Sequence, residues 1–341
     1  MPGRPHPRLA ALPVSLALAL CPAAAACSAG GDGDGHASVV GGESAPYAAS
    51  PYWVDPDSDA ARQVKKWQAE GRSADAKLLQ RISRRPVADW PAGDDPGPEI
   101  RHAVRSAAPT GRTVLLVAYN IPHRDCGKYS AGGAADAQAY QSWINAFASA
   151  IGDAPALVVL EPDALPHLAD GCTPPELQQE RYTLLSAAVT RLKQQPHTKV
   201  YLDAGNPAWV ADTGRMADAL KRAGVARADG FSLNVSNFQR DDAVKRYGAA
   251  ISGALGGAHF VMDTSRNGAG PLPGGRGDEA WCNPPGRALG RAPSTSTGDP
   301  LLDAYLWIKR PGDSDGTCRG GPAAGSWWPE YALGLARRAK S

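Results

Sequence analysis

The stretch Leu157-Val158-Val159-Leu160-Glu161-Pro162-Asp163 is a short apolar run that ends in two acidic residues. An uninterrupted apolar run of this length is typical of a strand buried on both faces of a parallel sheet. Three more acidic segments follow strand-like runs elsewhere in the chain, namely Arg124-Asp125-Cys126, Tyr201-Leu202-Asp203 and Asp313-Ser314-Asp315. Parallel strands in a barrel bring their carboxyl ends to one rim. We therefore expect four carboxylates from distant parts of the sequence to meet in one cleft.

The remaining sequence alternates between strand-like and helix-like segments. Strands are expected at residues 87–90, 114–119, 157–161, 199–203, 230–235, 259–263 and 303–308, and helices at 135–151, 176–194, 213–223 and 241–255. Such alternation implies right-handed βαβ crossovers and a parallel sheet. We predict one α/β domain with a distorted seven-stranded parallel β/α barrel, and an open doubly wound sheet is the alternative.

The N-terminal residues have the composition of an export signal. Arg4 and Arg8 precede an apolar stretch at 9–20, and small residues at 23–26 supply a cleavage site. The apolar stretch is too short to span a bilayer, and a buried N-terminal helix is the alternative. We expect a signal peptide at 1–26, a flexible linker or tether at 27–50 that is rich in Gly, Ala and Ser, and a catalytic domain at 51–341.

Cleavage before Cys27 would expose a residue that bacterial lipoproteins use as a lipid anchor, whereas cleavage after Ala25 or Ala26 would leave the chain without lipid. The protein is then secreted to the extracellular space or held at the cell surface. Removal of residues 1–26 leaves 34 basic and 34 acidic residues. This balance gives no indication of a nucleic-acid partner.

Four further cysteines form an even set suited to two disulfides in an oxidising compartment. Their count allows three connectivities, and their wide spacing does not fit a zinc site. These residues are Cys126, Cys172, Cys282 and Cys318.

Asp163 is the best candidate for a general acid. It follows a buried strand, and the apolar Leu165 and Pro166 nearby would raise its pKa. A neighbouring Asp125 carboxylate would raise the pKa further by repulsion between like charges. Each acidic residue taken alone could instead be a helix N-cap, but four of them on one predicted rim favour a functional cleft. Acid-assisted cleavage of an acetal requires such a protonated carboxyl group.

Aromatic residues in the predicted rim segments match the apolar faces of sugar rings. Trp90, Trp209 and Trp281 lie in such segments, with ordinary loop packing as the alternative, whereas Trp143 and Trp307 are predicted to be core residues. Lys309 would extend into the cleft to contact a sugar or Asp315, or else lie on the surface.

Asp263 is read as structural, paired with Arg266 or another base, and His123 is the only histidine expected near the acidic rim. The long segment 264–300 would lie over the rim, held through Cys282. The sequence contains no G-x-S-x-G, H-E-x-x-H or P-loop pattern, so we expect neither a metal nor an organic cofactor.

Six ordered motifs resemble those of glycoside hydrolase family 6, a family of cellulases. They are VAYNIPHRDC at 117–126, VLEPD at 159–163, YLDAG at 201–205, MDTSRNG at 262–268, WCN at 281–283 and WIKRPGDSDG at 307–316. The resemblance implies a distorted seven-stranded α/β barrel and cleavage of β-1,4-glucan with inversion.

The resemblance also implies roles for individual residues. Asp163 would be the general acid, Asp125 would raise its pKa and steer the water, and Asp315 would be a base or a charge lining the subsite. Tyr119 would press on the distorted sugar. Substrate contacts are implied for Trp90, Trp209, Trp281, Lys309, Asn234 and Asp313, and disulfides for Cys126–Cys172 and Cys282–Cys318.

The chain departs from the family pattern at three positions. Ala131 stands where a serine commonly helps to hold the attacking water, with Ser130 beside it; Asn206 replaces a histidine; and Asp313 replaces a glutamate. The compact segment 293–315 resembles the open-cleft endoglucanases rather than the cellobiohydrolases, whose longer loops roof the site.

We therefore expect a monomeric, secreted, inverting endo-β-1,4-glucanase acting on cellulose or a related β-glucan. The alternatives are a cellobiohydrolase of the same family and a surface β-glucan-binding protein with little catalysis.

Overall fold

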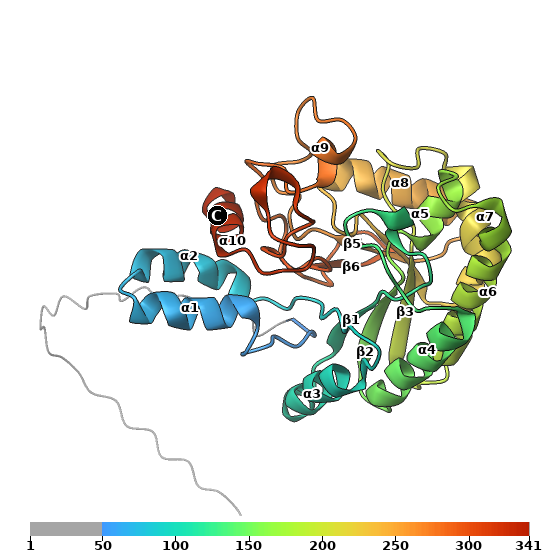
Figure 1. Cartoon of the computed structure of the whole chain (residues 1–341), viewed down its shortest axis with the longest axis horizontal. Helices are drawn as coiled ribbons and strands as arrows, with labels where there is room; N and C mark the ends of the chain where they lie inside the picture. The colour runs from blue at the N-terminus through green and yellow to red at the C-terminus, as the bar shows by residue number, and fades with distance from the viewer. Residues whose placement is uncertain (1–49, 341) are drawn as a thin grey trace, which may run out of the picture. The chain divides into compact units, whose positions relative to one another are not determined.

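Six parallel strands form one curled sheet in the computed structural model of the chain, which describes residues 50–340 (Figure 1). The strands lie side by side in their order along the chain, and every neighbouring pair is parallel. They are β1 (Val114–Ala118), β2 (Ala156–Leu160), β3 (Thr198–Asp203), β4 (Gly230–Leu233), β5 (Phe260–Asp263) and β6 (Leu302–Leu306). This sequential order excludes a doubly wound sheet, in which the order reverses. The six described strands form a half-barrel, since β1 and β6 do not pair, and the predicted full barrel is not confirmed.

Both faces of the sheet are buried, because successive side chains of a strand point to opposite faces. In β1, Leu116 and Ala118 join the core between the sheet and its helices, whereas Leu115 and Val117 join a second core on the other face. That second core combines side chains from distant strands, such as Val159 of β2 and Leu306 of β6. The continuous apolar runs in the sequence reflect this double burial.

Helices cover one face of the sheet, and all but the first of them follow a strand (Figure 1). They are α3 (Gly97–Ala107), α4 (Ala137–Ile151), α5 (Ala164–Ala169), α6 (Pro175–Leu192), α7 (Thr213–Ala223) and α8 (Asp241–Ala254). The ends of α7 show how the sequence sets such bounds. Asp212 caps the first turn by accepting from the N–H of Arg215 at 2.9 Å, and Gly224 ends the helix in the left-handed conformation.

A separate group of helices, which we did not predict, packs beside the sheet. Helices α1 (Asp59–Ala69) and α2 (Ser73–Ser83) lie next to the C-terminal α10 (Pro329–Arg338) (Figure 1). Their apolar faces form a cluster with Trp67, Leu79, Leu333 and Trp307. Trp307 is 2 % exposed, as expected for a core residue. The remaining elements are short: α9 (Asp278–Trp281) and the 3-10 turns η1 (Ala108–Thr110), η2 (Asp125–Gly127), η3 (Val225–Arg227) and η4 (Cys318–Gly320).

The prediction of seven strands was wrong by one. Segment 87–90 makes a single parallel bridge, between Asp89 and Leu116, and is not a strand. The N–H of Ala88 donates to the carbonyl of Trp307, and the N–H of Asp89 donates to the carbonyl of Leu115. Pro86 and Pro91 flank the segment, and since proline has no N–H to donate, pairing cannot extend in either direction.

The predicted signal peptide, the linker and the alternative lipid anchor at Cys27 lie outside the described residues. Within residues 50–340, no helix is long and apolar enough to cross a membrane. The described residues form one α/β domain.

Candidate active site

A cavity of about 1230 Å³ lies where the carboxyl ends of the strands meet. Its walls come from residues 90–94 before β1, from segments that follow β1, β2, β3, β4 and β6, and from parts of the long segment after β5. Nearly all of the site residues that we predicted line it: Trp90, Tyr119, Asp125, Asp163, Trp209, Trp281, Lys309, Asp313 and Asp315. The convergence expected from the strand pattern is therefore present.

Asp163 is half-buried and directly follows the Glu161-Pro162 turn after β2. It occupies the N-cap position of α5, yet its side chain makes no capping bond. Instead, Asp163 Oδ2 accepts a hydrogen bond of 3.2 Å from the Tyr119 hydroxyl. Burial, with the negative charge of Asp125, raises the pKa of Asp163 to about 6. Positive charges on His167 and Lys309 limit this rise. Asp163 is thus a carboxylic acid that keeps its proton in mildly acidic solution.

Asp125 differs from Asp163 in its surroundings. Its Oδ2 accepts from both the backbone N–H and the hydroxyl of Ser130, at 2.7 and 2.8 Å. Burial would raise the pKa of Asp125, but His167 and Ser130 outweigh it, and the pKa lies below its ordinary value. Ser130 Oγ is also 3.2 Å from the Tyr119 hydroxyl. Ser130 and Tyr119 therefore form a line of polar contacts between Asp125 and Asp163.

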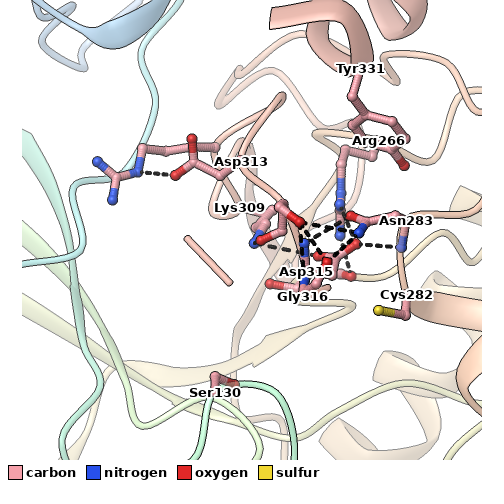
Figure 2. A network of polar contacts seen from close by, with 12 residues as sticks. Ser130, Arg266, Cys282, Asn283, Lys309, Asp313, Asp315, Gly316 and Tyr331 are labelled. Carbon is pink, nitrogen blue, oxygen red and sulfur yellow. Dashed lines mark hydrogen bonds and ion pairs between the residues drawn. The ribbon is translucent and has the colours of Figure 1, made fainter. Parts of the chain in front are cut away.

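Asp315 is a buried carboxylate held by positive charge, as Figure 2 shows. Its Oδ2 accepts from Arg266 at 2.8 Å and from the N–H of Asn283 at 3.0 Å, and Lys309 Nζ is 3.4 Å from Oδ1. Burial would raise the pKa of Asp315, but the charges of Arg266 and Lys309 outweigh it and lower the pKa. Asp315 thus stays ionised in the cavity that it shares with Asp163.

Two acidic residues of the predicted rim are anchors instead of cavity residues. Asp203, 1 % exposed, accepts the backbone N–H of Asp163 at 2.9 Å, and burial raises the pKa of Asp203 to about 7. Glu161, equally buried, accepts from the N–H groups of Asn120 and Ile121 at 3.0 Å. Each of these carboxyl groups fixes a neighbouring loop. The expectation that all four segments place a carboxylate in the cleft was therefore wrong for Asp203.

The cavity tryptophans are oriented by hydrogen bonds or ring contacts. Trp90 Nε1 donates to the carbonyl of Ile308 at 2.8 Å, and its ring meets Tyr119 edge-on. Trp209 Nε1 donates to Asp170 Oδ2 at 2.8 Å. Trp281 packs against Tyr129. Trp143, predicted as core, is 3 % exposed and belongs to the core, although it also borders the cavity.

Two disulfides close loops beside the cavity. Cys126 is bonded to Cys172, and Cys282 is bonded to Cys318, which confirms the pairing that the family resemblance implied. The second disulfide holds segment 264–300, as expected from Cys282. That segment contains α9, and Arg287 donates to the carbonyls of Gly270 and Pro271.

Two predicted side chains have other surroundings than expected. Asn234 is fully buried and does not line the cavity; its amide donates to the carbonyl of Asp263 at 2.9 Å. Asp263 does not pair with Arg266. It accepts from the N–H groups of Ser236, Ser265 and Lys309, and so fixes the start of the loops after β4, β5 and β6. Both residues support the rim from within.

Asp313, which borders the cavity, is buried and pairs with Arg310 at 2.9 Å. Burial raises the pKa of Asp313, and the charge of Arg310 limits the rise.

His167 is a cavity residue that we did not predict, whereas His123 is exposed and does not line the cavity. His167 lies on α5, four residues after Asp163, and is 3 % exposed. Its pKa is raised to about 9: burial would lower it, but Asp125, Asp170 and Asp163 outweigh burial. The spacing of four residues, which is one helical turn, was the signal in the sequence.

The backbone at the strand ends is strained. Asp125, Glu161, Asp163 and Asn234 have positive φ angles of 55°, 49°, 71° and 64°. Non-glycine residues are uncommon in this left-handed region and are enriched at functional sites.

The strand ends of this parallel α/β sheet bring together a carboxyl group of raised pKa, ionised carboxylates and oriented tryptophans. These are the components of a glycoside hydrolase. The family model "Glycosyl hydrolases family 6" matches residues 47–339. The chain therefore belongs to this family.

Individual relatives agree with this assignment. Endoglucanase A of Cellulomonas fimi is 41 % identical over 300 residues, which cover 86 % of this chain and 63 % of the relative. Endoglucanase 1 of Streptomyces halstedii is 41 % identical over 292 residues, which cover 82 % of this chain and 87 % of the relative. The chain thus spans about three fifths of the length of the first of these.

Among solved structures, the chain resembles the endoglucanase Cel6 from Mycobacterium tuberculosis in complex with methyl-cellobiosyl-4-deoxy-4-thio-β-D-cellobioside. The TM-score is 0.78 and the identity 45 %, and the match covers 86 % of this chain and 98 % of that one.

Proposed function

We propose that the chain is an inverting endo-β-1,4-glucanase that cuts internal bonds of cellulose or a related β-glucan. The observation that carries this proposal is the pairing of a protonated Asp163 with the ionised Asp125 and Asp315 in one tryptophan-lined cavity. In an inverting hydrolase, one carboxylic acid protonates the leaving oxygen while a water attacks the other face of the sugar.

In this mechanism Asp163 donates its proton to the glycosidic oxygen as the bond from that oxygen to the anomeric carbon breaks. Asp315, held by Arg266 and Lys309, supplies a fixed negative charge beside the positively charged transition state. Because Arg266 and Lys309 already hold its carboxylate oxygens, this role suits Asp315 better than that of a base. Tyr119 would press on the distorted sugar, and Lys309 and Asp313 would contact the substrate.

The proton of the attacking water needs an acceptor. Ala131 offers no hydroxyl, but Ser130 Oγ bridges Tyr119 and the ionised Asp125. We assign the route of this proton to Ser130 and Asp125, so that the neighbouring serine compensates for Ala131. Trp90, Trp209 and Trp281 would stack on glucose rings on both sides of the bond.

Cutting within the chain is supported by the compact segment 293–315 and by the endoglucanase names of the relatives. We further propose that segment 87–90 takes the place of a seventh strand, and that the protein is a secreted monomer. Residues 1–26 would be its signal, residues 27–50 a linker, and Cys27 an alternative lipid anchor. The two disulfides support export to an oxidising compartment.

The test is release of reducing sugar from carboxymethyl cellulose by the intact protein and by Asp163→Ala, with circular dichroism as a control for folding. We expect the variant to lose nearly all activity with its spectrum unchanged, and near-full activity would contradict the proposal. A rapid loss of viscosity relative to sugar release would indicate internal cutting, and a slow loss would indicate a cellobiohydrolase. NMR should show the α-anomer first, since inversion changes the β-linkage.

A further inference from the structure

His167 is enclosed between two carboxylates at the edge of the cavity. Its Nε2 is 3.9 Å from Asp125 Oδ1, and its Nδ1 is 3.5 Å from Asp170 Oδ2. Both distances suit an ion pair but are too long for good hydrogen bonds, and neither ring nitrogen has a hydrogen-bond partner among the described residues. The side chain is only 3 % exposed. Charge and packing, rather than hydrogen bonds, therefore hold this imidazole in place.

The same imidazole contacts one of the cavity tryptophans. The rings of His167 and Trp209 meet edge-to-face with centroids 4.8 Å apart. Trp209 Nε1 donates to Asp170 Oδ2, the same oxygen that lies nearest to His167 Nδ1. Asp170 thus contacts both rings, and a shift of the imidazole would disturb both the indole and the Asp125 carboxylate.

We propose that His167 is a positioning residue. Its ring lies between the Asp125 carboxylate and the Trp209 ring, and so it links the acid-base groups to the tryptophan that would stack on a sugar. This inference rests on the proposed function, because it assigns Asp125 and Trp209 the roles given above. It adds a residue that acts through its neighbours.

The charges around His167 favour its protonated form. Asp125 faces it from η2, Asp163 from the turn before α5, and Asp170 from the end of α5. From α7, Arg215 donates to the carbonyl of Ala169 at 2.8 Å and brings one positive charge to this region. The Asp125 and Asp170 carboxylates outweigh that charge, and Asp163 adds to them once it ionises. His167 therefore carries its proton throughout the pH range in which Asp163 keeps its own.

The positive charge of His167 determines the direction in which it shifts the pKa values of its neighbours. A positive charge stabilises a carboxylate, so His167 lowers the pKa values of both Asp125 and Asp163. Loss of the charge should raise both values. Asp125 must be ionised and Asp163 must be protonated for turnover, so both limbs of the pH profile should move to higher pH.

Two variants separate charge from packing. His167→Phe keeps an aromatic ring against Trp209 but removes the charge, and His167→Asn removes both. We expect both variants to shift both limbs of kcat/KM upward by roughly one pH unit, and His167→Asn also to raise KM. Asp170→Asn, which keeps an acceptor for Trp209, should shift the limbs less.

The matched control is His259→Asn. His259 pairs with Asp303 at 2.7 Å, but it precedes β5 and so lies at the opposite end of the strands from the cavity.

NMR titration of the intact protein, labelled at histidine, provides a readout that needs no active variant. The His167 signal, assigned as the one that His167→Asn removes, should titrate near pH 9. Titration near the ordinary value of about 6.5, or pH limbs unchanged in folded His167→Phe, would overturn the inference. If the variants do not fold, the titration of the intact protein decides, with its signals assigned by elimination through variants of the other histidines. An intact protein that releases no sugar would instead refute the proposed function, independently of the titration.

Discussion

The backbone N–H of Asp163 donates a hydrogen bond of 2.9 Å to Oδ2 of the buried Asp203. Asp203 is the last residue of β3, whereas Asp163 lies in the turn after β2. The left-handed conformation of Asp163 is thus fixed by a side chain from the neighbouring strand. The proposed acid owes its orientation to a residue that never reaches the substrate.

This contact predicts a difference between two substitutions of Asp203. Asp203→Asn keeps an oxygen that can accept the Asp163 N–H, whereas Asp203→Ala leaves that N–H without its partner, at a cost of about 1–3 kcal/mol. We expect Asp203→Ala to lower kcat at least tenfold and to reduce thermal stability, and Asp203→Asn to change both less. Steady-state kinetics on carboxymethyl cellulose with thermal denaturation would check this. Equal activity of the two variants would show that the bond does not position Asp163.

The pH dependence of activity follows from the two pKa shifts at the site. Asp163 must be protonated, so kcat/KM should fall as pH rises through about 6. Asp125 must be ionised, and because its pKa lies below the ordinary value, the acid limb should lie below pH 4. A profile with an optimum between these limbs is expected from initial rates on soluble cellulose. An optimum above pH 8 would contradict the assignment of Asp163.

Ser130 should matter for the rate more than for binding. Ser130→Ala removes the hydroxyl between Tyr119 and Asp125 but keeps the backbone N–H that also bonds Asp125. Since a positioned proton-transfer group contributes roughly 10²–10⁴-fold to rate, kcat should fall by about 100-fold with little change in KM. Ser149→Ala, on the exposed surface of α4, is the matched control. A normal kcat in Ser130→Ala would place the proton route elsewhere.

Arg266 should be required for stability. Its side chain is fully buried, donates to Asp315 and to the carbonyl of Ser236, and lies 4.4 Å over the ring of Phe238. Removing one partner of a buried ion pair costs about 3–5 kcal/mol, because the other charge stays buried. We expect Arg266→Met to lower the urea midpoint strongly. The double variant Arg266→Met with Asp315→Asn should recover part of the loss, and no recovery would indicate that packing dominates.

Much of the sheet could be predicted because its strands are buried on both faces. Runs such as Leu157–Leu160 have no polar interruption, and only double burial explains that pattern. The acidic residues after these runs then located the cavity. The prediction of a strand at 87–90 was wrong because a short apolar run resembles a strand whatever flanks it. Here the flanking Pro86 and Pro91 have no N–H to donate, so pairing cannot extend.

Other features depend on contacts that no local pattern records. Asp203 and Asp163 look alike in the sequence, since each stands at the end of a buried apolar run. Only the register of β2 and β3 brings the Asp203 carboxyl group to the backbone N–H of Asp163. Helices α1, α2 and α10 pack through residues far apart in the chain. His167 was overlooked because its importance comes from three carboxyl groups that the fold brings around it.

The positive φ angles at Asp125, Glu161 and Asp163 have a consequence for engineering this protein. Such conformations cost of order 1–3 kcal/mol each, so replacement by glycine would make the chain more heat-tolerant. The gain would remove the very side chains that form or hold the reaction centre. Substitutions that aim to raise the thermal stability should therefore keep the residues at the strand ends and be made on the outer helices, away from the cavity.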